Sequence, residues 1–283
     1  MERRVIAVLA GQPDDVMWRD ATSQASTAIA SLRLTGTFSP AHQTHQRGHF
    51  PTLAMGVSHG GGRVAPGDMS NSSKNQALLT EICRNRAIQC IAGFGSSAFA
   101  AFAPKAFNHA AAHLEKLYSS KPSLCRNFPN SIYPAATFNI GPHAVCFDHT
   151  DDQNSPATWC AITALGSFDP KCGGHLVLFD LKLVIEFPPS STILIPSALL
   201  RHGNLPIHGG ECRQSFTQYC TGSLLRWVDY GFRTEAEFAS QDPCGKQEFN
   251  RSIEERTDAV LELFSVYENL LEDCKNAADA RLS

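Results

Sequence analysis

The spacing of apolar residues changes along the chain, from a helical period in the first half to short strand-like runs in the second. Between Asp15 and Leu34, and again from Asn75 to Tyr118, apolar residues and alanines recur at helical spacing. This pattern predicts one helix and, further on, two or three more. Residues 40 to 75 are rich in glycine and proline, and predict loops around a short strand, Leu53 to Val57.

Beyond Pro134 the apolar runs become short and rich in β-branched residues, and glycine or proline bounds them. Such runs predict strands of an antiparallel sandwich or barrel. They are His143 to Phe147, Thr158 to Leu165, His175 to Phe187, Thr192 to Ile195 and Ser215 to Trp227.

The C-terminal segment returns to helical spacing. Apolar residues from Lys246 to Ala278 predict an amphipathic helix, and Ser252 and Glu255 are spaced like a capping box. We therefore expect an α+β fold in one domain over residues 1–283. Helices and loops would fill about 1–130, the β core about 135–231, and a C-terminal helix about 246–278.

The composition limits the possible partners. Hydrophobic residues make up 43% of the chain and charged residues 18%, which is enough for a packed core. Lysine plus arginine (24) against aspartate plus glutamate (27) gives 24 − 27 = −3, so any contact with nucleic acid must come from a local patch. The ten cysteines contain no CxxC pair, and no stretch reaches the roughly 18 apolar residues of a membrane span. We expect reduced thiols and no membrane partner.

A candidate metal site begins at His149-Thr150-Asp151. Because side chains alternate along a strand, this spacing would put both ligands on one face. His202 follows 51 residues after Asp151, just beyond the predicted strand Thr192 to Ile195. Two histidines and one carboxylate are the facial triad of non-haem iron oxygenases, which leaves coordination positions open for co-substrate and dioxygen.

His208 competes with His202 for the place of the distal ligand, since it lies five residues before Arg213. We favour His202, because Gly209-Gly210 would place His208 within a turn. A guanidinium can hold the remote carboxylate of 2-oxoglutarate through two parallel charge-assisted hydrogen bonds. Arg213 is the candidate for this contact, with the Ser215 hydroxyl beside it. These residues predict Fe(II), 2-oxoglutarate and O2 as cofactor and co-substrates.

Several short motifs, in order along residues 45 to 233, resemble the TET/JBP family of DNA-modifying dioxygenases, and most of all its basidiomycete (mushroom) members. The motifs are Met55-Gly56-Val57-Ser58-His59-Gly60-Gly61-Gly62, Ile91-Ala92-Gly93-Phe94, Cys172-Gly173-Gly174-His175-Leu176, Phe187-Pro188-Pro189, Leu194-Ile195-Pro196-Ser197 and Arg226-Trp227-Val228. The resemblance implies a double-stranded β-helix core of the jelly-roll or cupin type. It also implies oxidation of 5-methylcytosine in DNA to its hydroxymethyl, formyl and carboxyl forms, or demethylation of N6-methyladenine.

The resemblance also implies substrate contacts for a base flipped out of a methylated duplex. Asn154, five residues after His149, stands where the family has an asparagine that bonds the base, and Tyr219, six after Arg213, where it has a stacking aromatic ring. Thr221 stands where animal and protist relatives have a base-contacting histidine, which leaves adenine open as the substrate.

Positive charge near this region is sparse. His59 and Arg63 in the glycine-rich loop from Ser58 to Gly67 are candidates for DNA contacts, because glycine permits close approach and arginine pairs with phosphate. A basic rim could add Arg84, Arg86 and Lys105. With DNA as partner we expect a nuclear protein, and we expect a monomer.

Three other functions compete with DNA oxidation. The chain could be a 2-oxoglutarate oxygenase of a protein or a small molecule, which the metal motif does not exclude. It could be a binding module that keeps the fold, although a pure binder has no need for open metal positions. Gly56-Val57-Ser58-His59-Gly60 matches the GxSxG nucleophile elbow of α/β-hydrolases, but the glycines and prolines that follow do not favour the helix this motif requires.

Overall fold

The computed structural model describes residues 3–250 and 253–282, and its strands form two antiparallel sheets. The larger sheet has the order β1-β8-β5-β10-β4-β2-β3, and the smaller has the order β7-β6-β9. In the larger sheet the strands are β1 Val8–Gly11, β2 Thr52–Ser58, β3 Gly67–Asp68, β4 Ala135–Asn139, β5 Cys160–Ser167, β8 Thr192–Ile195 and β10 Cys212–Tyr219. In the smaller sheet they are β6 Leu176–Leu178, β7 Leu183–Ile185 and β9 His202–Asn204.

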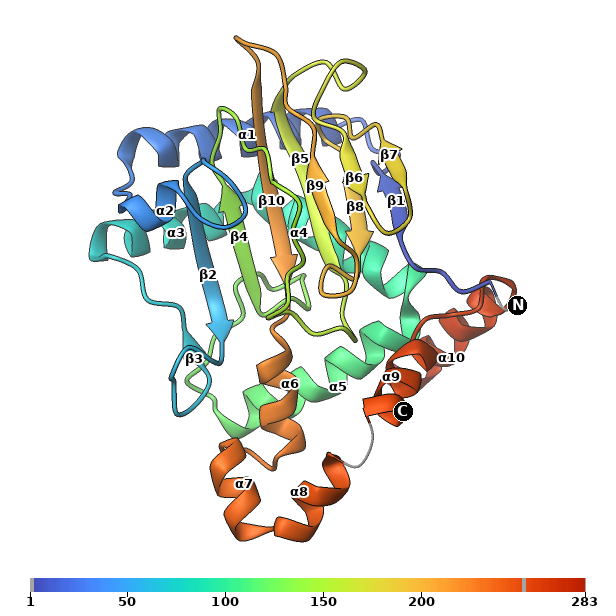
Figure 1. The fold of residues 1–283 in the computed structure, drawn as a ribbon. Coiled ribbons are helices and arrows are strands. Elements are labelled where there is room, and N and C mark those ends of the chain that lie inside the picture. Colours follow the sequence, from blue (N-terminus) through green and yellow to red (C-terminus); the bar gives the residue numbers. More distant parts are fainter. Residues whose placement is uncertain (1–2, 251–252, 283) are drawn as a thin grey trace.

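The smaller sheet lies in front of the larger one in Figure 1, and α1 (Trp18–Thr35) and α4 (Arg86–Phe102) lie behind it. Phe187 and Leu178 belong to the apolar cluster between the two sheets. Residues 146–149 run alongside β9 as an irregular fourth strand, through the Asn204 N–H bond to Cys146 O (2.8 Å) and a pair of bonds between His149 and His202. This mixed helical and antiparallel architecture agrees with the predicted α+β class and is consistent with a double-stranded β-helix.

Side chains of β10 alternate between a face that packs against the helices and a face that lines a cavity. Phe216 packs into the core beneath α1 and α4, and Gln218 donates to Ala92 O of α4 at 3.1 Å. The odd-numbered residues Arg213, Ser215 and Thr217 point the other way and line a cavity between the sheets. The period-two alternation of the strand therefore presents three polar side chains of β10 to one cavity.

Three helices follow β3, where the sequence predicts two or three over residues 75–118, and short breaks separate them. They are α3 Ser73–Arg84, α4, and α5 Pro104–Ser120, while α2 spans Pro40–Gln43. Asn85 caps α4 by accepting from the N–H of Ala87 at 2.9 Å, and Pro104 occupies the first turn of α5. Among the described residues no single helix is long and apolar enough to cross a membrane, whereas α4 and α5 together, bent by 119°, pass the same test.

The C-terminal third differs from the prediction at two places. The last strand ends at Tyr219, and residues up to Trp227, predicted as strand, belong to helix α6 (Gly222–Asp229), whose Leu224 and Leu225 are buried. Short apolar runs do not distinguish strand from helix. The tail also forms several helices in place of one: α7 Glu235–Gln241, α8 Pro243–Phe249, α9 Ile253–Glu262, η1 Tyr267–Asn269 and α10 Leu270–Leu282.

The break between α9 and η1 has a visible cause. The N–H of Val5 bonds to Ser265 O at 2.9 Å and the N–H of Tyr267 to Arg3 O at 2.8 Å, so the N-terminal segment pairs with the chain there. The capping box predicted at Ser252 lies outside the described residues. The larger sheet also takes β1, β2 and β3 from the N-terminal part, so the β structure extends beyond the predicted range 135–231.

Candidate active site

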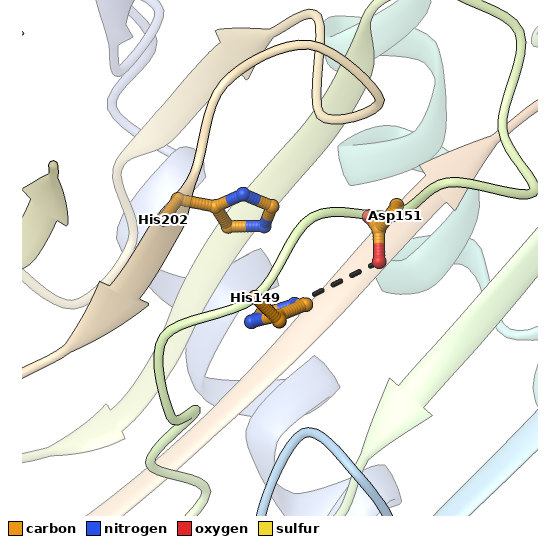
Figure 2. Close-up of side chains that lie close together, drawn as sticks. All are labelled: His149, Asp151 and His202. Atoms are coloured by element: carbon orange, nitrogen blue, oxygen red, sulfur yellow. Dashed lines mark ion pairs between the residues drawn. The ribbon is translucent and has the colours of Figure 1, made fainter. Parts of the chain in front are cut away.

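Three candidate ligands meet at the β9 edge of the smaller sheet. The ligand atoms of His149, Asp151 and His202 all lie within 4.8 Å of one another, and His149 Nε2 is 3.7 Å from Asp151 Oδ1. Figure 2 shows the three side chains pointing toward one another. His208, the rival for the distal position, is exposed on the turn before β10 and takes no part in this cluster.

Strand pairing places the two imidazoles. The N–H of His149 bonds to His202 O at 3.0 Å, and the N–H of His202 bonds to His149 O at 2.9 Å. Residues paired in this way lie directly opposite each other with side chains on the same side, and the two ring centroids are 4.3 Å apart. Asp151 lies beyond the paired segment, where its N–H bonds to Ser197 O at 2.9 Å. Its position therefore comes from Ser197 and not from the strand alternation that the sequence suggests.

Both imidazoles are held in the form that binds a metal. His149 Nδ1 lies 2.7 Å from Phe147 O, and His202 Nδ1 lies 2.8 Å from Leu200 O. A carbonyl oxygen only accepts, so each Nδ1 carries the hydrogen, and the Nε2 lone pairs are free to bind an ion. Burial lowers the pKa of His202, and the neighbouring His149 lowers it further. Neutral imidazole is the form a metal requires.

Arg213 closes the deep end of the same cavity. Its side chain is 1% exposed, and its guanidinium lies 5.9 Å from the ring centroid of Phe168 and 5.8 Å from that of Phe187. Nη1 donates to Ala144 O, whereas Nε has no hydrogen-bond partner among the described residues. Burial lowers the pKa of Arg213 to about 10, so the group remains a cation at neutral pH.

Ser215 is next to Arg213 on the same face of β10. Its Oγ accepts from Asn139 Nδ2 at 2.8 Å, and both residues line the cavity that holds the three candidate ligands. The polar groups on this cavity therefore include two imidazoles, one carboxylate, a buried guanidinium and a hydroxyl. The donor set fits Fe(II), with 2-oxoglutarate and O2 as the co-substrates that the open positions and the guanidinium accommodate.

A second, outer pocket of about 390 Å³ shares Arg47, Asp151 and Thr217 with this metal cavity. Tyr219 and Thr221 line it, as does Asn154. The Tyr219 hydroxyl accepts from Thr137 Oγ1 at 3.3 Å, and burial raises its pKa. The Asn154 amide points into the wall, toward Asp151, Ser197 and Cys160.

The glycine-rich loop after β2 forms another wall of the outer pocket, through Ser58 to Gly61. His59 is held there: its ring nitrogens face Ser223 O (3.4 Å) and Arg63 O (3.2 Å), and its ring packs edge-on against Trp227. Arg63 donates to Gly67 O (2.9 Å) and Asp68 O (2.8 Å). Both residues predicted to contact DNA thus also fasten the loop.

The predicted basic rim is not gathered at the pocket. Lys105 pairs with Asp273 at 3.3 Å, and Arg84, Arg86 and Lys105 line neither the metal cavity nor the outer pocket.

The hydrolase alternative disagrees with the structure. Ser58 ends β2, and the chain continues as a loop to the short strand β3, with no helix before Ser73. A nucleophile elbow needs a helix directly after the serine. The His59 ring is directed at backbone oxygens, so it is not placed as a base for Ser58.

Sequence reasoning does not single out Arg47, although it lines both the metal cavity and the outer pocket. Its carbonyl accepts from the N–H of Phe147 at 2.8 Å, which ties this loop to the strand that carries His149. The neighbouring Gly48 is the one sequence feature that marks this loop. It has a φ of 155°, and a Cβ there would lie 2.7 Å from Val145 O. One arginine in a polar loop, about a hundred residues before the motif, gives no pattern to recognise.

No protein-family model and no curated protein sequence matches the chain. Solved structures similar to it include NgTET1 in complex with 5mC DNA, at 14% identity and a TM-score of 0.46, over 75% of this chain and 69% of that one. A Pseudomonas putida prolyl-4-hydroxylase matches at 14% identity and a TM-score of 0.37, over 76% and 91%. An oxidoreductase of the 2OG-Fe(II) oxygenase family from Burkholderia pseudomallei matches at 14% and 0.37, over 74% and 91%.

Proposed function

We propose that this chain is an Fe(II)- and 2-oxoglutarate-dependent oxygenase. The observation that carries the proposal is the state of Arg213, a fully buried cation on the cavity of the candidate triad. Among the described residues no carboxylate lies within ion-pairing distance of it. An unpaired buried charge is costly, so the site is suited to an anionic ligand that enters from outside.

The residues of the cavity would bind two different groups, the metal and its co-substrate. His149, Asp151 and His202 would hold the metal, and Arg213 with Ser215 would bind the remote carboxylate of 2-oxoglutarate. When bound, Fe(II) with 2-oxoglutarate and dioxygen supplies the oxidation of an unactivated C–H bond. The rings of Phe168 and Phe187 beside Arg213 exclude water, which strengthens the contact between guanidinium and carboxylate.

The proposed substrate is a methylated base in DNA, either 5-methylcytosine or N6-methyladenine. The outer pocket supports this choice, since about 390 Å³ lies within the range of small-ligand pockets and adjoins the metal cavity through Asp151. The Tyr219 ring on its wall is suited to stack on a flipped base. Thr221 lines the same pocket and gives no imidazole to select cytosine. With duplex DNA as partner, the protein would act in the nucleus.

The test is to incubate the purified protein with Fe(II), 2-oxoglutarate and duplexes that carry either methylated base. Mass spectrometry of the nucleosides should show hydroxymethylcytosine and its further oxidation products, or loss of the methyl group from adenine. Succinate formation without any change in either duplex would support the oxygenase activity, and would indicate a protein or a small molecule as the substrate. Absence of succinate with both duplexes would contradict DNA oxidation, and failure of the purified protein to bind Fe(II) would contradict the oxygenase itself.

A further inference from the structure

The two carboxylate oxygens of Asp151 have different surroundings. Oδ1 faces the candidate metal position and is 3.7 Å from His149 Nε2. Oδ2 faces the protein and lies 3.3 Å from Asn154 Nδ2. A carboxylate only accepts hydrogen bonds, so the amide nitrogen of Asn154 must be the group that points at it.

The Asn154 amide is held in turn by a buried polar cluster. Nδ2 is 3.1 Å from Ser197 Oγ and 3.3 Å from Cys160 Sγ, and these two atoms are 2.8 Å apart. Asn154, Ser197 and Cys160 are 8%, 1% and 2% exposed. An amide nitrogen has two hydrogens, so Oδ2 can receive one of them while Ser197 or Cys160 receives the other.

The backbone fixes the same unit from a second side. The N–H of Asp151 bonds to Ser197 O at 2.9 Å, and the N–H of Asn154 bonds to Asp151 O at 2.8 Å. Ser197 thus contacts Asp151 through its backbone and Asn154 through its side chain. These backbone bonds hold the turn from Asp151 to Asn154, and the Asn154 amide contacts the carboxylate from within it.

We infer that Asn154 is a positioning residue for Asp151, and that it fixes this carboxylate to bind the metal through Oδ1 alone. A hydrogen bond to Oδ2 disfavours bidentate binding and leaves a coordination position open for the co-substrates. Ser197 and Cys160 hold the amide in this orientation. The inference rests on the proposed metal site, but it is independent of the DNA substrate. It gives Asn154 a role other than the base contact implied by the family resemblance.

The experiment measures binding of Mn(II), which replaces Fe(II) without oxidising, by calorimetry in the absence of 2-oxoglutarate and DNA. Asn154→Ala should weaken Mn(II) affinity roughly 10- to 100-fold, as expected when the hydrogen-bond partner of a ligand is lost. Ser197→Ala should weaken it less, because Ser197 Oγ acts on Asp151 through Asn154. This second variant also tests the inference if Asn154→Ala fails to fold.

Asn75 provides a matched control. It is 1% exposed and joins α3 to the loop after α1, through bonds of 2.8 and 2.9 Å to the backbone of Thr37. Asn75→Ala should lower the melting temperature with Mn(II) affinity unchanged. Wild-type Mn(II) affinity in both Asn154→Ala and Ser197→Ala would overturn the positioning role alone. Failure of the wild-type protein to bind Mn(II) would instead remove the metal site, and this inference with it.

Discussion

The metal cavity and the outer pocket adjoin each other, yet they are built by different means. In the metal cavity, paired backbones place His149 opposite His202, and carbonyl oxygens fix both rings. In the outer pocket, part of the wall is a loop in which Gly60, Gly61 and Gly62 all have positive φ. No atom within 4 Å would meet a Cβ at Gly61 or Gly62, so close packing does not hold the tip of this loop.

This difference implies that metal binding and substrate selection can be altered by substitutions at different places. Strand register determines the metal cavity, so a substitution there should alter metal or co-substrate binding for every substrate. A few side-chain contacts, such as those of His59 and Arg63, hold the loop of the outer pocket. Substitutions in that loop should alter selection of the substrate and leave metal binding intact.

Removal of a ligand should have the largest effect. His149→Ala deletes one of three groups whose ligand atoms meet within 4.8 Å, so we expect Fe(II) affinity and turnover to fall by at least about 100-fold. Metal content and succinate formation are the measurements. His208→Ala is the control and should bind Fe(II) like the wild type, because His208 lies outside the cluster. Loss of Fe(II) binding in His208→Ala would assign the distal position to His208 in place of His202.

Substitution at Arg213 should affect the co-substrate next. Arg213→Lys keeps a cation but loses the planar fork, and loss of a charge-assisted hydrogen bond costs about 1.5–3 kcal/mol. The apparent KM for 2-oxoglutarate should rise roughly 10- to 100-fold, with Mn(II) affinity unchanged. Arg201→Lys is the control, since Arg201 is an exposed residue paired with Asp148. An unaltered KM in Arg213→Lys would remove Arg213 from this role.

The contrast between the two regions also explains what the sequence could predict. His149, Asp151, His202 and Arg213 are recognisable because their residue types and order reflect metal and carboxylate chemistry. The carbonyls that fix the imidazole tautomers belong to the backbone, so no residue type reveals them. Strand periodicity located β8, but the short apolar run after Tyr219 fits strand and helix equally, and burial of Leu224 and Leu225 decides for α6.

A moderate effect is expected at Tyr219, on the outer pocket. Stacking of a base on an aromatic ring is worth about 1–3 kcal/mol, so Tyr219→Ala should lower kcat/KM for methylated DNA roughly 5- to 150-fold. Tyr219→Phe should behave nearly like the wild type, because the hydroxyl makes only a 3.3 Å contact with Thr137. Mn(II) affinity should be unchanged in both variants. Equal activity of Ala and Phe variants on DNA would contradict a stacking role.

The smallest effect is expected at Arg63, where fastening of the loop and contact with phosphate predict different results. Its Nη1 atom donates to Gly67 O and Asp68 O, and we expect their loss in Arg63→Ala to loosen the loop by about 1 kcal/mol. Limited proteolysis should then cut between residues 58 and 67 more rapidly, and turnover on DNA should fall roughly fivefold or less.

Salt dependence separates the two roles of Arg63. If the side chain only fastens the loop, the slope of log affinity for DNA against log salt should be the same in Arg63→Ala and in the wild type. Loss of a phosphate contact would reduce that slope by about one. Because the loop carries three successive positive-φ glycines, a reduced slope would mean that it rearranges on DNA and frees the guanidinium from Gly67 and Asp68. The outer pocket would then be completed by its substrate, in contrast to the metal cavity, where strand pairing already places both imidazoles.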